Sequence, residues 1–199
     1  NEDKKIKSLF ENNFKGKYLD IGCYHPTKVN NTLNLYRNGW HGMNIDLNHF
    51  TIELFKYARP KDINVCAALS SRKEKKKLYF LGDLDPKNTL DIYHIKWLKK
   101  YFNVLTKDIK TKIIKTTKLQ DLLTKYNFKK IDFLNIDIEG HEAEVLKNFN
   151  FDKYGVKVIC IEILDYNKSK KRKIISFLKK RGFSLRKKFT VNYIFEKNK

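Results

Sequence analysis

Short apolar runs alternate with segments of helical spacing along most of the chain. In the first third, apolar runs bounded by turn-forming residues predict buried strands at 18–21, 43–46 and 63–68. Between them, the spacing predicts a helix that begins at Asn30 or Asn31 and ends at Gly39, and a second helix from Asn48 to Tyr57. Strands and helices that alternate in this way predict the first half of a doubly wound α/β sheet.

The same alternation returns in the last third of the chain. It predicts helices at 119–126, 140–148 and 169–181, and strands at 131–137 and 156–164. Two final apolar runs, at 183–186 and 191–195, have no helix between them, so they are predicted to pair antiparallel. The complete pattern predicts a Rossmann-like, seven-stranded, mostly parallel sheet with a C-terminal antiparallel hairpin and helices on both faces.

The middle of the chain, at about 72–118, departs from this order. An apolar run predicts a strand at 77–81, a loop follows from Gly82 to Pro86, and 90–109 has helical spacing. Since no linker or repeat interrupts the rest, we expect residues 1–199 to form one domain. The segment at 72–118 would then be an insertion that covers the substrate site.

Composition adds three expectations. Of the 199 residues, 41% are apolar, which is enough to bury a core, yet there is no run of about 18 apolar residues that would predict a transmembrane helix. The N-terminus also lacks the apolar segment of a secretory signal. Cys23, Cys66 and Cys160 have no disulfide or zinc spacing, so we expect reduced thiols in a cytoplasmic protein.

The net charge of +21 leaves two interpretations open. A basic surface attracts anionic partners such as nucleic acid or phosphorylated glycans. However, Lys, Asn and Ile are abundant throughout, which is also the composition of proteins from AT-rich genomes. No basic stretch carries a nucleic-acid-binding motif, so nucleic acid is kept as an alternative partner.

Acidic residues follow three of the predicted strands. Asp20 and Gly22 lie at the end of the first, and Asp46 ends the second. Asp137 ends the strand at 131–137, and Glu139 follows it. Ligands of doubly wound sheets bind at the carboxyl ends of the strands, where a carboxylate can accept both hydroxyls of an adenosine ribose. Asp46 could alternatively serve only as a helix N-terminal charge. A single glycine after the first strand argues against the glycine-rich turn of NAD enzymes.

Four segments carry a family resemblance: YLDIGCYHP at 18–26, GWHGMNID at 39–46, RPKDIN at 59–64 and IDFLNIDIEG at 131–140. In order and spacing they resemble the FkbM-type methyltransferases, a class I group known mainly for O-methylation of sugars and natural products. The resemblance covers roughly residues 15–196. Cys23, Tyr24 and His141 differ from the residues that are more common in that family. Because they lie near the expected site, they could change which substrate is bound, whereas cofactor binding is expected to remain.

The resemblance implies S-adenosyl-L-methionine as cofactor and S-adenosyl-L-homocysteine as product. Asp20 and Gly22 would hold the methionine end, Asp46 the ribose, and the segment at 66–68 would border the adenine. The expected cofactor-binding residues are Asp20, Gly22, Cys23, Tyr24, Asp46, Leu47, Cys66, Ala67, Ala68 and Asp137.

Methyl transfer to a hydroxyl needs a positioned acceptor and a base. His25 is the first candidate base, because it lies on the cofactor loop, and Glu139 and His141 are its competitors. Thr32, Asn88 and Thr89 are the expected substrate contacts. Asp137 and Glu139 could also ligate a divalent ion, but no further carboxylate cluster has metal-binding spacing, so no metal is predicted.

The leading hypothesis is therefore an S-adenosylmethionine-dependent O-methyltransferase. Its acceptor would be a hydroxyl of a sugar, a glycan precursor or a related small molecule. Because the protein has a net positive charge, the acceptor molecule could carry negative charge. The alternatives are an RNA methyltransferase that uses the basic surface, and a catalytically silent basic binding module on the same fold.

Overall fold

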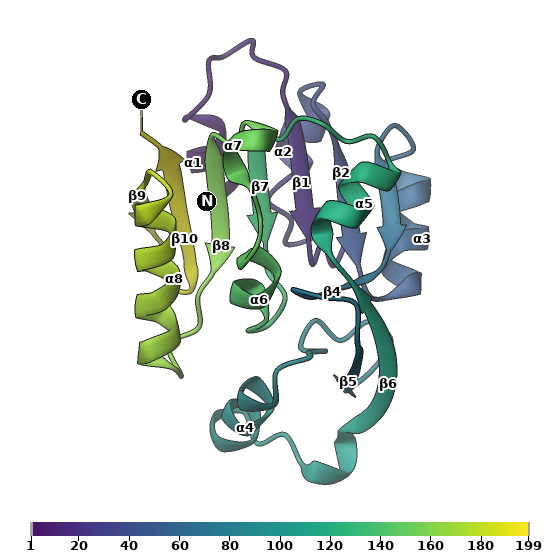
Figure 1. Cartoon of the computed structure of the whole chain (residues 1–199). Helices are drawn as coiled ribbons and strands as arrows, with labels where there is room; N and C mark the ends of the chain where they lie inside the picture. The colour runs from purple at the N-terminus through teal and green to yellow at the C-terminus, as the bar shows by residue number, and fades with distance from the viewer. Residues whose placement is uncertain (1, 199) are drawn as a thin grey trace.

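A seven-stranded sheet organises the computed structural model, which describes residues 2–198 (Figure 1). The strand order is β3-β2-β1-β7-β8-β10-β9. The strands are β1 (Lys17–Ile21), β2 (His41–Asp46), β3 (Ile63–Cys66), β7 (Phe133–Ile136), β8 (Val158–Glu162), β9 (Phe183–Lys188) and β10 (Asn192–Lys197). The first five are parallel, and β10 runs antiparallel to both β8 and β9. The predicted fold class is confirmed.

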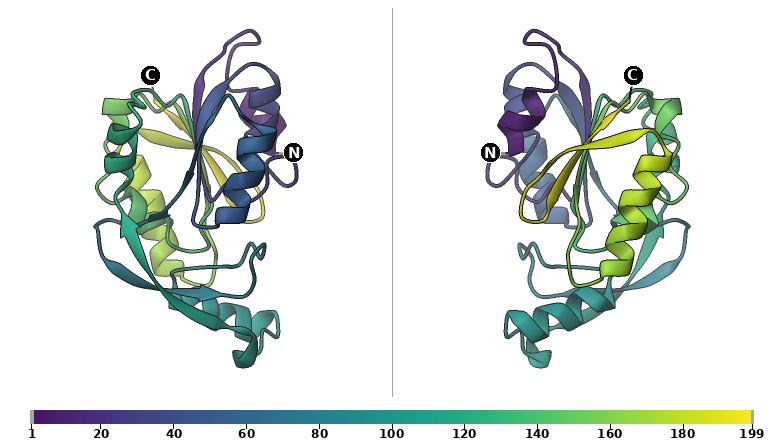
Figure 2. Two further views of the ribbon diagram at one scale, coloured as in Figure 1. Left: turned by 90° about the vertical axis from the view of Figure 1, so that its right-hand side faces the viewer. Right: turned by 90° about the vertical axis from the view of Figure 1, so that its left-hand side faces the viewer.

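Helices cover both faces of this sheet (Figure 2). One face carries α1 (Glu2–Lys7), α2 (Leu33–Arg37) and α3 (His49–Ala58), and the other carries α5 (Leu119–Lys125), α6 (Glu142–Leu146), α7 (Phe151–Tyr154) and α8 (Lys168–Lys180). Alternate residues of β1 serve the two layers. Leu19 and Ile21 pack in the core under α5–α8, and Tyr18 packs in the core under α1 and α2. No helix within residues 2–198 is long and apolar enough to cross a membrane.

The N-terminal caps of α2 and α3 determine where these two helices begin. Asn48 caps α3 as predicted, because its side chain accepts a hydrogen bond from the Phe50 N–H at 2.9 Å. The other prediction was wrong by one to two residues, since the N-cap of α2 is Thr32 rather than Asn30 or Asn31. The Asn30 and Asn31 side chains instead bind groups at the ends of β1 and β7, which holds their backbone outside the helix.

The insertion forms a small separate sheet below the carboxyl ends of the parallel strands (Figure 1). Its strands are β4 (Ala68–Leu69), β6 (Lys110–Thr117) and β5 (Lys75–Phe80), in the order β4-β6-β5, and it also contains α4 (Ile92–Tyr101) and a 3-10 turn at Thr106–Asp108. The predicted strand at 63–68 is divided: Cys66 pairs with Asp46 in the large sheet and Ala68 pairs with Thr116 in the small one. Strand β6 was not predicted.

Gly22 permits the close approach of β1 and β7 at the site end of the sheet. Its φ of +76° lies in the left-handed region, and a Cβ built on it would lie 1.7 Å from the Asp137 carbonyl oxygen. Its N–H also donates to the Ile45 carbonyl at 2.8 Å. A residue with a side chain cannot occupy this position without moving the Asp137 backbone.

We therefore predict that Gly22→Ala lowers the free energy of unfolding by about 3 kcal/mol, measured by urea denaturation. Gly155→Ala is the matched control, because Gly155 also has a positive φ, of +65°, but a Cβ added there would meet no atom within 4 Å. That variant suffers only backbone strain and should lose about 1 kcal/mol. Equal losses in the two variants would show that the contact with Asp137 is unimportant.

Candidate functional site

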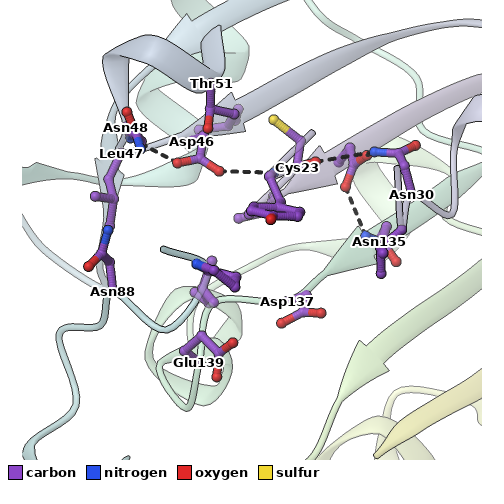
Figure 3. Close-up of a pocket in the computed structure, with 18 of the residues that line it drawn as sticks. Cys23, Asn30, Asp46, Leu47, Asn48, Thr51, Asn88, Asn135, Asp137 and Glu139 are labelled. Carbon is purple, nitrogen blue, oxygen red and sulfur yellow. Dashed lines mark hydrogen bonds between the residues drawn. The ribbon is translucent and has the colours of Figure 1, made fainter. Parts of the chain in front are cut away.

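A cavity of about 740 Å³ lies at the carboxyl ends of β1, β2 and β7. The segment that follows β1 forms one wall, and the loop at 84–90 of the insertion faces it. Figure 3 shows the side chains of Asp46, at the end of β2, and of Asn135 and Asp137, at the end of β7, around this space. This is the position at which doubly wound sheets bind their ligands.

Asp20, near the end of β1, holds the loop at 22–32 that forms this wall of the cavity. It has no exposed surface, and its carboxylate accepts hydrogen bonds from Thr32 Oγ1 at 2.7 Å, Asn135 Nδ2 at 2.8 Å and Asn30 Nδ2 at 3.3 Å. Burial raises the pKa of Asp20, while these donors and the charge of Arg59 oppose that rise. The Thr32 hydroxyl is thereby engaged with Asp20, which explains why it makes no helix-capping bond to α2.

Arg59 holds the same segment from the other side. Its guanidinium donates to Thr32 Oγ1 at 2.7 Å and to Asn30 Oδ1 at 2.8 Å, and it also donates to the Pro26 carbonyl. The side chain is 1% exposed and lies 4.9 Å from the centre of the Phe55 ring. Arg59, Thr32 and Asp20 thus form a buried chain of charge-assisted hydrogen bonds that ties the loop at 22–32 to the end of β1.

Asp46 faces the cavity at the end of β2. Its Oδ1 accepts from the Asn48 N–H at 2.8 Å, and its Oδ2 accepts from the Tyr24 N–H at 3.1 Å (Figure 3). Each oxygen therefore keeps one lone pair for another donor. Burial raises the pKa of Asp46 to about 6, against the opposing effect of the Asn48, Tyr24 and Leu47 N–H groups.

Three more carboxyl groups gather at the ends of β7 and β8. Oxygens of Asp137, Glu139 and Glu162 lie within 4.8 Å of one another. Burial raises the pKa of all three groups, and the charge of Asp137 raises those of Glu139 and Glu162 further. Glu142 is a separate case, because its Oε1 accepts from the Ile138 and Gly140 N–H groups at 3.1 and 2.9 Å and closes the turn that carries Glu139.

Most of the expected cofactor residues line the cavity. They are Asp20, Gly22, Cys23, Tyr24, Asp46, Leu47, Ala67, Ala68 and Asp137. Cys66 differs: among the described residues it is outside the lining set, and its thiol donates to the Leu47 carbonyl at 3.6 Å. The structure brings these residues together from three strand ends and the loops that follow them.

The three candidate bases are placed differently. Glu139 and His141 line the cavity, but the lining set within residues 2–198 does not include His25. The His25 Nδ1 instead accepts from the Thr27 and Lys28 N–H groups at 3.2 and 3.1 Å and closes its own turn. His141 is buried with Nε2 3.3 Å from Ser70 Oγ, and burial lowers its pKa to about 4.

The expected substrate contacts also divide. Asn88 and Thr89 line the cavity, whereas Thr32 is fully buried in the Asp20–Arg59 chain and is outside the described lining set. The Thr89 hydroxyl donates to the Glu139 carbonyl at 2.8 Å, which ties the insertion to the end of β7. Sequence reasoning missed Asn135 and Asn30, although an amide within the apolar strand 131–137 was a signal that something polar faces it.

One comparison with known proteins identifies a family. The family model described as "Methyltransferase FkbM domain" matches residues 20–185, a span that includes the three strand ends around the cavity. No curated protein matches the chain.

The anchoring of the loop can be tested at Arg59. We predict that Arg59→Met, which keeps much of the side-chain volume, lowers the free energy of unfolding by about 3 kcal/mol because it leaves Asp20 and Asn30 buried without their cationic partner. Hydrogen exchange at 22–32 should accelerate. Arg72→Met is the control, since Arg72 pairs with Glu74 but is 76% exposed, and its change should stay within about 0.5 kcal/mol. Unchanged exchange at 22–32 in Arg59→Met would contradict the anchoring role.

Proposed function

The chain belongs to the FkbM family of methyltransferases, and we propose that it transfers a methyl group from S-adenosyl-L-methionine to a hydroxyl of a neutral polyol, such as a sugar or glycan precursor. The observation that carries this proposal is the charge of the cavity. Seven carboxyl-bearing residues line it: Glu2, Asp3, Asp20, Asp46, Asp85, Asp137 and Glu139. Among the described residues no lysine or arginine lines it, although the chain has a net charge of +21.

An acidic cavity in a basic protein favours a cationic or neutral ligand. The cofactor brings a positively charged sulfur and an ammonium group, which suit these walls. An anionic acceptor, or an RNA phosphate close to the reacting atoms, would be repelled by the same carboxylates. The cavity therefore supports a neutral hydroxyl acceptor over both the anionic glycan and the RNA alternative.

The residues at the strand ends fit the cofactor. Asp46 has one free lone pair on each oxygen, which suits the two vicinal hydroxyls of a ribose. Leu47, Ala68 and Leu69 give the neighbouring wall apolar surface for an adenine ring. We place the methionine end beside Gly22 and Asn30, in front of the buried Asp20, so that Asp20 acts by positioning the loop that contacts the ligand.

When bound, the cofactor supplies a methyl group on a sulfonium: the acceptor oxygen forms the new C–O bond, the C–S electron pair remains on sulfur, and the hydroxyl proton is released. The chain has to orient the acceptor and exclude water. Glu139, His141 and Asn88 line the cavity around the place left for the acceptor. We therefore assign acceptor binding to this group, and proton removal to Glu139 or His141 rather than to His25.

The cofactor site is tested by calorimetric titration with S-adenosyl-L-homocysteine. We predict micromolar binding by the wild type and about a hundredfold loss in Asp46→Ala, because two hydrogen bonds to a carboxylate are removed. Asp121→Ala is the control: Asp121 lies on α5 outside the cavity, pairs with Lys73, and should leave the affinity unchanged. Failure of the folded wild type to bind would contradict the proposed function.

The affinity should also depend on pH. Because the pKa of Asp46 is raised to about 6, the carboxylate that accepts from the ribose is ionised above this value and protonated below it. Affinity should therefore be constant from about pH 7 upward and fall by about tenfold between about pH 7.5 and about pH 5. The same titration of Asp46→Asn provides the comparison, and an equal loss of affinity on acidification in that variant would assign the pH dependence to another group.

A further inference from the structure

Three carboxylates from two adjacent strands converge beside the cavity. Asp137 and Glu139 follow β7, and Glu162 ends β8, which pairs with β7 in parallel. One oxygen from each lies within 4.8 Å of the others. Asp137 and Glu139 line the cavity, and in Figure 3 they lie on a different side of it from Asp46. Three carboxyl groups at this separation cannot all be ionised where water is scarce unless a cation joins them.

No lysine or arginine pairs directly with this cluster within the described residues, although the charge of Lys87 acts on Glu139 from a distance. Among the ion pairs of residues 2–198, none joins a lysine or arginine to any of the three carboxylates. The nearby ammonium of Lys170 is engaged by Asp91 at 2.7 Å and by the Gly140 carbonyl. The Glu162 side chain is 7% exposed, and its Oε2 accepts from no donor. Such a buried oxygen is compensated either by a cation or by a proton shared with Asp137, and burial raises the pKa of Glu162 in the direction of the shared proton when no cation is bound.

A second unpartnered group points at the same place from the insertion. His94 of α4 is 1% exposed, and neither of its ring nitrogens has a hydrogen-bond partner. Its Nε2 lies 3.2 Å from Glu139 Oε2 without the geometry of a hydrogen bond. In metal sites, hydrogen bonds from surrounding side chains commonly orient the ligating carboxylates. His94 lies close enough to the Glu139 carboxylate to orient it in this way once the carboxylate binds an ion.

We propose that Asp137, Glu139 and Glu162 bind a hard divalent cation of the Mg²⁺ or Mn²⁺ type, with His94 as a positioning residue for Glu139. Three carboxylate oxygens are donors that such cations prefer, and they leave coordination positions open toward the cavity. The role of the ion rests on the proposed function: it holds an acceptor hydroxyl and lowers the hydroxyl pKa, so that the proton leaves to water and Glu139, as a ligand of the ion, no longer has to remove it. The acceptor class is then a polyol that can bind the ion through oxygen.

The test is titration of Mn²⁺ into the full chain, followed by the loss of the free-ion electron paramagnetic resonance signal, with and without saturating S-adenosyl-L-homocysteine. We expect one Mn²⁺ per chain, bound equally well in both conditions, and displaced by excess Mg²⁺. Glu162→Gln should weaken binding by about tenfold or more. Glu53→Gln is the control, since Glu53 is a half-exposed residue of α3 paired with Lys56, and it should bind Mn²⁺ like the wild type.

Folding of the variants is checked by thermal melting. Because burial raises the pKa of Glu162 and favours its neutral form, Glu162→Gln should melt near the wild-type temperature without metal, and added Mn²⁺ should raise the melting temperature of the wild type alone. Asp137→Asn repeats the test from the other strand. The proposal is overturned if the folded wild type binds no Mn²⁺, if Glu162→Gln binds it as tightly, or if the homocysteine product displaces it, which would mean that the cofactor ammonium occupies the cluster. Product binding measured in the same samples tests the proposed function separately.

Discussion

The buried hydrogen-bond chain from Arg59 through Thr32 to Asp20 is the constraint on which the site depends. A carboxylate without exposed surface at the end of an apolar strand is stable only if donors and a cation compensate for its lost hydration. Arg59 supplies the cation, and Thr32, Asn30 and Asn135 supply donors. This arrangement holds the loop at 22–32 in one conformation. The loop in turn presents the Tyr24 N–H to Asp46, so the geometry of the second strand end follows from the first.

The cavity and the chain as a whole carry opposite charge. The chain has 43 basic and 22 acidic residues, yet its cavity is lined by carboxyl groups. Burial raises the pKa of Asp46 and Asp137, so these groups release protons when a cation enters the cavity and lowers their pKa. A positively charged cofactor and a neutral acceptor are what such walls stabilise.

Features that depend on local order were predictable, and features that depend on long-range register were not. The strand at 131–137 is largely apolar and Asn48 is a good N-cap, so both elements followed from the residues themselves. Strand β6 escaped prediction because lysines and isoleucines do not alternate along it and most of it is exposed. Glu162 was hidden within a predicted strand: only the pairing of β7 with β8 places it beside Asp137. The His25 ring was a different case: its Nδ1 binds N–H groups of its own turn, and the residue types alone did not indicate this.

The most direct test of a cofactor site at the ends of β1 and β2 is nuclear magnetic resonance of the amides that donate to Asp46. On addition of S-adenosyl-L-homocysteine, we predict large shifts of the Tyr24 and Asn48 amide signals, together with slower hydrogen exchange at both. The Gly155 amide, in the turn after α7, should not move and serves as the reference. Saturable binding that leaves the Tyr24 and Asn48 signals in place, and shifts amides of the insertion instead, would contradict the assignment of the site.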